Sequence, residues 1–335
     1  MRTLLSRLSI DPYIASIIGM VVVASVLPAQ GVGLTLASGA GTAAIALMFF
    51  LQGARLSPQA ALAGARHWRL HAMVLGSTFL IFPAIGLTLH ALAPKLLTAP
   101  LWAGLLMLCL LPSTVQSSIA FTSIARGNVA AALCAATASN LFGILLTPLL
   151  AGLLLSAHGG FSVRAVGDIV VQLLLPFIAG QLARRWIGAW VRDHKAIGMM
   201  VDRGSILLIV YVAFSEGVTH GIWHQVDAAQ LGVLLLLDAA LLGAVLLATS
   251  LGSRLLGFDR ADQITIVFCG SKKSLASGLP MASVLFAGQS VGLIVLPLML
   301  FHQIQLMVCA ALARRWAAEP AANAVVGRRR TLHTI

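Results

Sequence analysis

The strongest constraint on the fold of this chain is a succession of long apolar runs separated only by short connections. Hydrophobic residues make up 59% of the 335 residues, and charged residues only 10%. A water-soluble globule of this composition would expose more apolar surface than its interior could hold. We therefore expect residues 1–335 to form a single transmembrane domain in a lipid bilayer.

The apolar runs are long enough to cross a membrane many times. A helix needs about 20 apolar residues to span ~30 Å of hydrocarbon. Such windows lie near residues 11–28, 36–54, 70–92, 100–124, 127–156, 166–186, 199–218, 230–252, 262–285 and 290–313. The sequence thus predicts an all-α, polytopic membrane protein with ten transmembrane helices, of which the fourth and ninth are interrupted by polar residues.

The basic residues predict how these helices are oriented, because Lys and Arg near span ends stay on the cytoplasmic side. With both termini cytoplasmic, all 22 Lys and Arg residues fall on that side except Lys95, Arg164, Lys272 and Lys273. This bias accounts for the net charge of +12 and argues against nucleic-acid binding. We expect a multi-pass protein of the plasma (inner) membrane, with residues 319–335 as a basic cytoplasmic tail.

The sequence carries no pattern typical of a metal site or an enzyme. Its four cysteines lie inside apolar runs without the paired spacing of a zinc site or a disulfide framework. No Ser-His-Asp set or His/Asp metal cluster occurs at useful spacing. We expect no cofactor and no enzymatic activity; a serine–lysine dyad from Ser271 or Ser274 is a remote alternative.

Five predicted helices in each half put the two halves into the membrane in opposite orientations. This is the inverted repeat that many secondary transporters use, here residues 1–157 and 158–318. A Gly-x4-Pro-Leu pattern near the end of each half, from Gly143 and from Gly292, gives weak internal support. The sequence therefore predicts two inverted five-helix repeats.

The fourth helix of each half contains residues that disrupt helical hydrogen bonding. One stretch follows Pro112, and the other runs from Gly270 to Pro280 with several serines between. Proline lacks a backbone donor, and serine and threonine offer the backbone other partners. Backbone groups freed at membrane depth must be buried or line a cavity, so we expect the translocation site around residues 112–123 and 269–280. The alternative is that the prolines only kink ordinary helices.

Lys272 and Lys273 lie inside the ninth span. A charge at the centre of a helix costs ~2.5–3.5 kcal/mol on insertion scales and usually marks function or a partner. A lysine here could bind an anionic substrate, or take the place of a cation and exchange a proton. The structural alternative is a buried ion pair with Asp238 or Glu216.

Candidate binding residues come from the two interruptions and from polar pairs on the fifth and tenth spans. Each pair, Thr137 with Asn140 and His302 with Gln305, could share a helix face, or could make only an interhelical hydrogen bond. The full set is Ser113, Thr114, Gln116, Ser117, Ser118, Thr137, Asn140, Ser271, Lys272, Lys273, Ser274, His302 and Gln305.

The ninth span also carries a family resemblance. Phe268-Cys-Gly-Ser-Lys-Lys-Ser-Leu-Ala-Ser-Gly-Leu-Pro-Met281, followed by Val284-Leu-Phe-Ala-Gly288, resembles the signature of the bile acid:sodium symporter superfamily. The branch is the one that includes solute carrier family 10 member 7 and bacterial relatives, and Ala125-Arg-Gly-Asn-Val-Ala130 is similar to the same connection there. The resemblance implies a panel domain (spans 1, 2, 6 and 7) and a core domain (spans 3–5 and 8–10), with spans four and nine crossing where they unwind.

The resemblance implies a secondary transporter of a small organic anion that moves its core against its panel, with sodium or a proton as coupling ion. Sodium-coupled members place a glutamate near Ser271 or Lys272, and hydroxyls where this chain has Ala132 and Ala136. Our hypothesis is that coupling at the usual sodium site is weakened or absent, with a lysine replacing the charge of the ion. A regulator of calcium or cation homeostasis without its own transport is the alternative, and the oligomeric state is left open.

Overall fold

The structure is a computed structural model that describes residues 12–55, 67–156, 163–219, 221 and 227–319. This described part is helical and contains no strand. Six of its helical segments are long and apolar enough to cross a membrane. Large apolar side chains point outward along them, with Leu92 78%, Leu153 72% and Leu236 71% exposed. Lipid is the solvent that suits such a surface.

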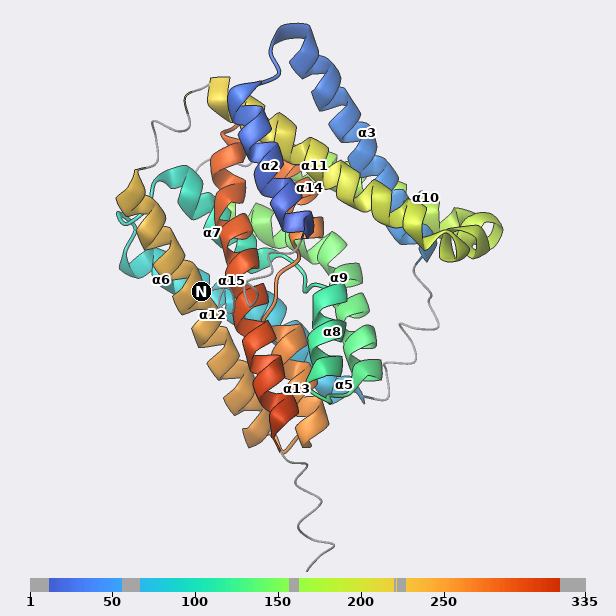
Figure 1. Cartoon of the computed structure of the whole chain (residues 1–335), viewed down its shortest axis with the longest axis vertical. Coiled ribbons are helices and arrows are strands. Elements are labelled where there is room, and N and C mark those ends of the chain that lie inside the picture. The colour runs from blue at the N-terminus through green and yellow to red at the C-terminus, as the bar shows by residue number, and fades with distance from the viewer. Residues whose placement is uncertain (1–11, 56–66, 157–162, 220, 222–226, 320–335) are drawn as a thin grey trace, which may run out of the picture.

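Four helices form one group, which we call the panel group. They are α2 (Pro12–Val26), α3 (Gly31–Arg55), α10 (Val163–Asp193) and α11 (Lys195–Thr219). Helix α10 packs along α3, and α11 packs on α2 and α3. The group occupies the upper part of Figure 1.

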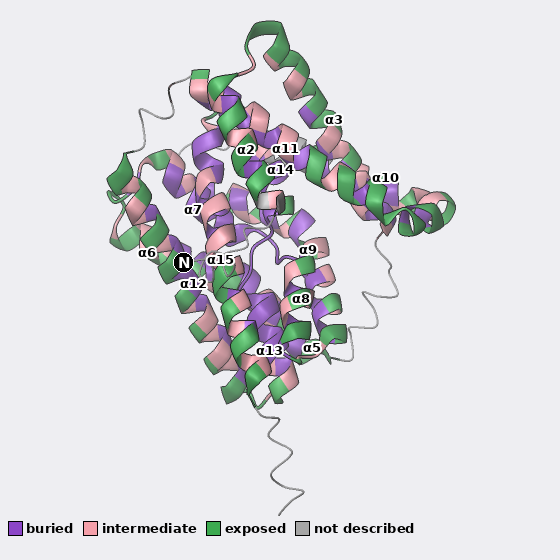
Figure 2. Cartoon of the chain, viewed as in Figure 1, coloured by how far each residue is buried: buried purple, intermediate pink, exposed green. Residues whose placement is uncertain are grey.

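The remaining helices form a second group, which we call the core group. They are α5 (Trp68–Gly76), the π-helix η2 (Ser77–Ile81), α6 (Phe82–Leu92), α7 (Ala99–Leu110), α8 (Gln116–Ile124), α9 (Val129–Ser156), α12 (Ala228–Leu255), α13 (Arg260–Gly270), α14 (Leu275–Leu285) and α15 (Val291–Ala318). Contacts of α11 with α14 and α15, and of α10 with α9 and α14, join the two groups. The buried residues gather within the core group and where the groups meet (Figure 2).

Both predicted interruptions are present, and they lie against each other. Helix α7 ends before Leu111 and α8 begins at Gln116, while α13 ends at Gly270 and α14 begins at Leu275. The backbone N–H of Ser274 donates to the carbonyl oxygen of Pro112 at 2.9 Å. The hydroxyl of Ser113 donates to the carbonyl oxygen of Cys269 at 2.6 Å. Each interruption therefore supplies hydrogen-bond partners to the other.

Several boundaries differ from the prediction. Gln116 to Ser118 form the first turn of α8 and do not lie in the interruption, and the Ser117 and Ser118 hydroxyls bond to side chains and backbone outside this turn. Pro280 lies inside α14 at its sixth residue, so the helix continues through the proline and lacks only the hydrogen bond that its backbone nitrogen cannot donate. Helix α10 continues well past residue 186, since arginines end a hydrophobic span without ending a helix. The predicted tail beyond Glu319 and the boundary at residue 157 lie outside the described residues.

Candidate functional site

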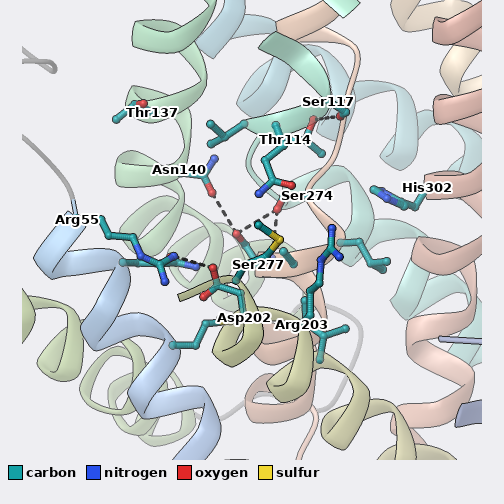
Figure 3. A pocket seen from close by; sticks show the side chains of 18 of the residues that line it. Arg55, Thr114, Ser117, Thr137, Asn140, Asp202, Arg203, Ser274, Ser277 and His302 are labelled. Carbon is teal, nitrogen blue, oxygen red and sulfur yellow. Dashed lines mark hydrogen bonds and ion pairs between the residues drawn. The ribbon is translucent and has the colours of Figure 1, made fainter. Parts of the chain in front are cut away.

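A cavity of about 540 Å³ lies between the panel group and the core group. Side chains of α2, α3, α10 and α11 form its panel wall, and α9, α15 and the two helix interruptions form its core wall (Figure 3). The polar lining residues are Tyr13, Gln52, Arg55, Thr114, Gln116, Ser117, Thr137, Asn140, Asp202, Arg203, Ser274, Ser277 and His302. Both groups and both interruptions therefore contribute to one cavity.

Asn140 on α9 connects the two interruptions. Its Nδ2 donates to the carbonyl oxygen of Ser113 at 2.7 Å and to that of Ala136 at 3.1 Å. Its Oδ1 accepts a hydrogen bond from the hydroxyl of Ser277 at 3.0 Å, which Figure 3 shows at the cavity. The Ser274 hydroxyl in turn accepts from the backbone N–H of Ser277 at 3.2 Å and caps α14. The amide of Asn140 thus fixes the position of both helix starts.

Helices α8 and α14 both begin at the cavity. Gln116 and Ser117 in the first turn of α8, and Leu275 and Ala276 in the first turn of α14, are lining residues. The first N–H groups of a helix have no partner within the helix, and the helix dipole is positive at this end. Two such ends at one cavity make its core wall favourable for a negatively charged ligand.

The hydroxyl groups near the first helix interruption form hydrogen bonds mainly with one another and with the backbone near the second interruption. Thr114 Oγ1 lies 2.7 Å from the Ser117 hydroxyl and 3.2 Å from that of Ser118. Ser118 is fully buried, and its hydroxyl donates to the carbonyl oxygen of Phe268 at 3.1 Å. Thr114 and Ser117 line the cavity. Ser118 and Ser113 do not line it, and they connect the two interruptions behind the cavity wall.

Carbonyl oxygens enclose the Lys273 ammonium. Lys273 is 0% exposed, and its Nζ donates to the carbonyl oxygens of Thr78, Cys109 and Leu111, each at 2.8 Å. Nζ also lies 4.1 Å from the centroid of the Phe82 ring. The three carbonyls belong to η2 and to the end of α7, where regular helical bonding is shifted or stops. Lys273 therefore satisfies freed backbone groups and is absent from the cavity lining.

Lys272 is equally buried but makes fewer contacts. Its Nζ donates to the carbonyl oxygen of Ser117 at 2.7 Å. The ammonium lies 4.0 Å from the ring centroid of Phe121 and 5.3 Å from that of Phe268, so it makes cation–π contacts with α8 and α13. Lys272 does not line the cavity either. It lies behind the first turn of α8, which lines the cavity.

Neither lysine pairs with the acids considered as partners from the sequence. Asp238 is 0% exposed on α12, and its carboxylate oxygens have no hydrogen-bond partner among the described residues. Glu216 lines a second cavity of about 200 Å³. The ion-pair alternative is therefore wrong, because carbonyl oxygens and aromatic rings surround both ammonium groups instead.

Of the two predicted site residues on α15, His302 lines the cavity and Gln305 is buried inside the core group. His302 lines the cavity, and its Nδ1 lies 2.8 Å from Nε2 of Gln305. Gln305 is 0% exposed and brackets Lys273: its Oε1 accepts from the backbone N–H at 2.8 Å, and its Nε2 donates to the backbone carbonyl at 2.9 Å. Gln305 therefore holds the second interruption in place and does not line the cavity.

The cavity brings together seven of the predicted site residues. These are Thr114, Gln116, Ser117, Thr137, Asn140, Ser274 and His302. The others support the core wall from within: Ser113, Ser118, Ser271, Lys272, Lys273 and Gln305 are buried and are not lining residues. Among the described residues, no cluster of three or more His, Cys, Asp or Glu side chains could hold a metal ion.

Sequence reasoning missed the panel wall of the cavity. Arg55 on α3 and Asp202 on α11 form an ion pair at 2.6 Å. The Arg203 guanidinium lies 5.0 Å from the ring centroid of Tyr13 and points toward the core wall in Figure 3. The charge pattern predicts only a cytoplasmic position for Arg55 and Arg203, and nothing in the local sequence of these residues indicates that three separate helix ends meet at one cavity.

Comparisons with known proteins identify the family of this chain. Residues 11–318 match the model of the SBF-like CPA transporter family. The chain is 53% identical over 309 residues to PA2026 of Pseudomonas aeruginosa and 52% identical over 308 residues to YfeH of Escherichia coli (strain K12), each alignment covering 92% of this chain and 93% of the relative. It is 29% identical over 272 residues to the mouse sodium/bile acid cotransporter 7, covering 79% of each chain. This multi-pass membrane protein therefore belongs to the SBF-like CPA transporter family, of the bile acid:sodium symporter type.

Proposed function

We propose that the chain is a secondary active transporter of an organic anion, with ten transmembrane spans arranged as two inverted repeats. The panel group and core group are the two bodies whose relative movement opens the site to each side in turn. One observation carries this proposal: the cavity lies between the two groups, and its core wall is built from both helix interruptions. A fixed structural pocket would need neither feature.

The charges around the cavity favour an anion. Two helix starts present backbone N–H groups from the core wall, and Arg203 points toward them from the panel wall. The lining acid Asp202 is already paired with Arg55. Apolar side chains, among them Met48 and Phe177, complete the lining and can contact the apolar part of a ligand. An amphipathic organic anion fits this combination, and the name of the mouse relative refers to a bile acid.

We place the coupling ion, sodium or a proton, away from the lysine pair. Two buried ammonium groups repel a second cation at short range, and the carbonyl oxygens nearest Lys273 already accept hydrogen bonds from it. The relatives' names refer to symport and to sodium, so coupling itself is part of the proposal. We further propose that the protein resides in the plasma (inner) membrane with both termini cytoplasmic, because the basic span ends then face the cytoplasm.

Uptake of labelled taurocholate into proteoliposomes tests this function. We expect saturable uptake by the wild type. For Arg203→Gln we expect a concentration for half-maximal uptake that is roughly tenfold higher or more, because a hydrogen bond to a charged group contributes about 1.5–3 kcal/mol. Arg254→Gln removes an exposed charge at the end of α12, outside the cavity, and should leave uptake unchanged.

Two outcomes would count against parts of this proposal. Uptake of taurocholate and other organic anions no faster than in protein-free liposomes would contradict transport through this cavity. Uptake that rises steeply with external sodium and is lost in Ser117→Ala or Ser118→Ala would contradict our position for the coupling ion, while leaving the transport function intact.

A further inference from the structure

The C-terminal end of α10 extends beyond a simple membrane span. Helix α10 has 31 residues, which at about 1.5 Å per residue gives a length of roughly 46 Å. The hydrocarbon core of a bilayer is only ~30 Å thick, so α10 is longer than a span, and its basic C-terminal end favours the boundary between membrane and water over the hydrocarbon. We call residues 182–197 the α10–α11 elbow; much of it is exposed at the edge of the molecule in Figure 2.

One side of the elbow presents an apolar stripe. Leu182, Trp186 and Trp190 are 69%, 66% and 51% exposed, and their four-residue spacing puts them on one face of α10. The His194 ring stacks on Trp190 with centroids 4.5 Å apart. Exposed tryptophans are typical of the level of lipid headgroups, where the ring is in apolar surroundings and the indole N–H meets polar groups.

Basic side chains border this stripe. The Arg185 guanidinium lies 3.7 Å from the ring centroid of Trp186. Arg192 and Lys195 are exposed at the turn between the two helices, and none of these three cations forms an ion pair within the described residues. Asp193 is the only acid among residues 182–197. The elbow therefore has an excess of positive charge beside an exposed apolar surface.

We infer that the α10–α11 elbow binds the headgroup of an anionic phospholipid. Arg185, Arg192 and Lys195 contact the phosphate and any further acidic group, and an acyl chain lies along the stripe from Leu182 to Trp190. A soluble anion would use the cations alone and would leave the stripe uncovered. A lipid uses both features, and it would hold this end of the panel group at the membrane surface.

Native mass spectrometry of the full chain in micelles containing phosphatidylglycerol and phosphatidylcholine tests this inference. We expect the wild type to retain phosphatidylglycerol selectively. The triple variant Arg185→Gln/Arg192→Gln/Lys195→Gln should retain it about 100-fold more weakly, since each basic residue near an anionic surface contributes about a factor of five. Trp186→Ala/Trp190→Ala should also weaken retention, because the stripe loses its rings.

The matched control is Arg254→Gln/Arg314→Gln/Arg315→Gln, which removes three exposed charges from the ends of α12 and α15. It should retain phosphatidylglycerol as the wild type does. Equal loss in the control, equal retention of phosphatidylcholine, or displacement of the lipid by inorganic phosphate would each overturn the inference. Thermal stability of every variant in detergent separates lost lipid binding from lost folding.

Discussion

Lys272 and Lys273 are adjacent and both fully buried, yet their surroundings give them different roles. Lys273 uses all three of its N–H donors on carbonyl oxygens of η2 and α7. Lys272 makes one hydrogen bond, to Ser117 in the α8 start, and otherwise faces aromatic rings. Lys273 is thus part of what holds the broken helices together, whereas Lys272 lies between the crossing and the cavity wall.

This difference predicts unequal effects on stability. Lys273→Met keeps the aliphatic volume but leaves three buried carbonyl groups without a donor, each worth about 1–3 kcal/mol, so we expect a loss of ~3 kcal/mol or more. Lys272→Met removes one hydrogen bond to a carbonyl oxygen that lies inside helix α8, and should cost about 1 kcal/mol. Thermal unfolding in detergent measures both, and equal shifts in melting temperature would contradict the assignment of roles.

At the scale of helices, the panel group depends on a close crossing of α3 and α10. A Cβ atom on Gly180 would overlap the carbonyl oxygen of Phe50, and one on Gly53 would overlap that of Phe177. The two glycines therefore allow the helix backbones to touch, as small residues do in membrane helix pairs. Arg55, the last residue of α3, is brought by this crossing to the panel wall of the cavity.

Gly180→Ala should therefore destabilise the protein by about 1–3 kcal/mol, because the neighbouring backbone has to move. Gly243→Ala on α12 is the matched control, since a Cβ there meets nothing within 4 Å. It should be neutral or stabilising by up to about 1 kcal/mol, as expected for alanine replacing glycine in a helix. Melting temperatures of the two variants in the same detergent test this crossing. A melting temperature of Gly180→Ala as high as that of the control would show that the helices do not touch there.

Local sequence patterns predicted long apolar helices and two interruptions, but not how these elements meet. Pro112 and the Gly270–Pro280 stretch correctly indicated two interrupted helices, because broken helical bonding leaves a local signature. The π-helix at Ser77–Ile81 carries a similar signature, with Ser77 and Thr78 at its start and Pro83 just after it, but no interruption was predicted there. The position of Arg203 at the cavity could not be predicted from the local sequence, because it depends on which distant helix ends meet there.

Across the whole molecule, two cavities lie between the panel and core groups. Helix α11 lines both, through Asp202 and Arg203 at the larger and Glu216 at the smaller. Between these positions the same helix buries Val210, which is 0% exposed and lines neither cavity. Packed apolar contacts thus separate two hollows along one boundary. Under the proposed alternating access, this packing closes the path between the two cavities.

Accessibility of a cavity residue from both sides of the membrane tests the central claim most directly. The protein would carry Thr137→Cys at the cavity together with Cys134→Ala, because Cys134 is the one native cysteine that is not fully buried. A membrane-impermeant thiol reagent would then be applied to right-side-out and inside-out vesicles with taurocholate present. We predict labelling from both faces, because the panel and core groups exchange which side is open. Labelling from one face only, with or without taurocholate, would contradict alternating access and leave a static pocket.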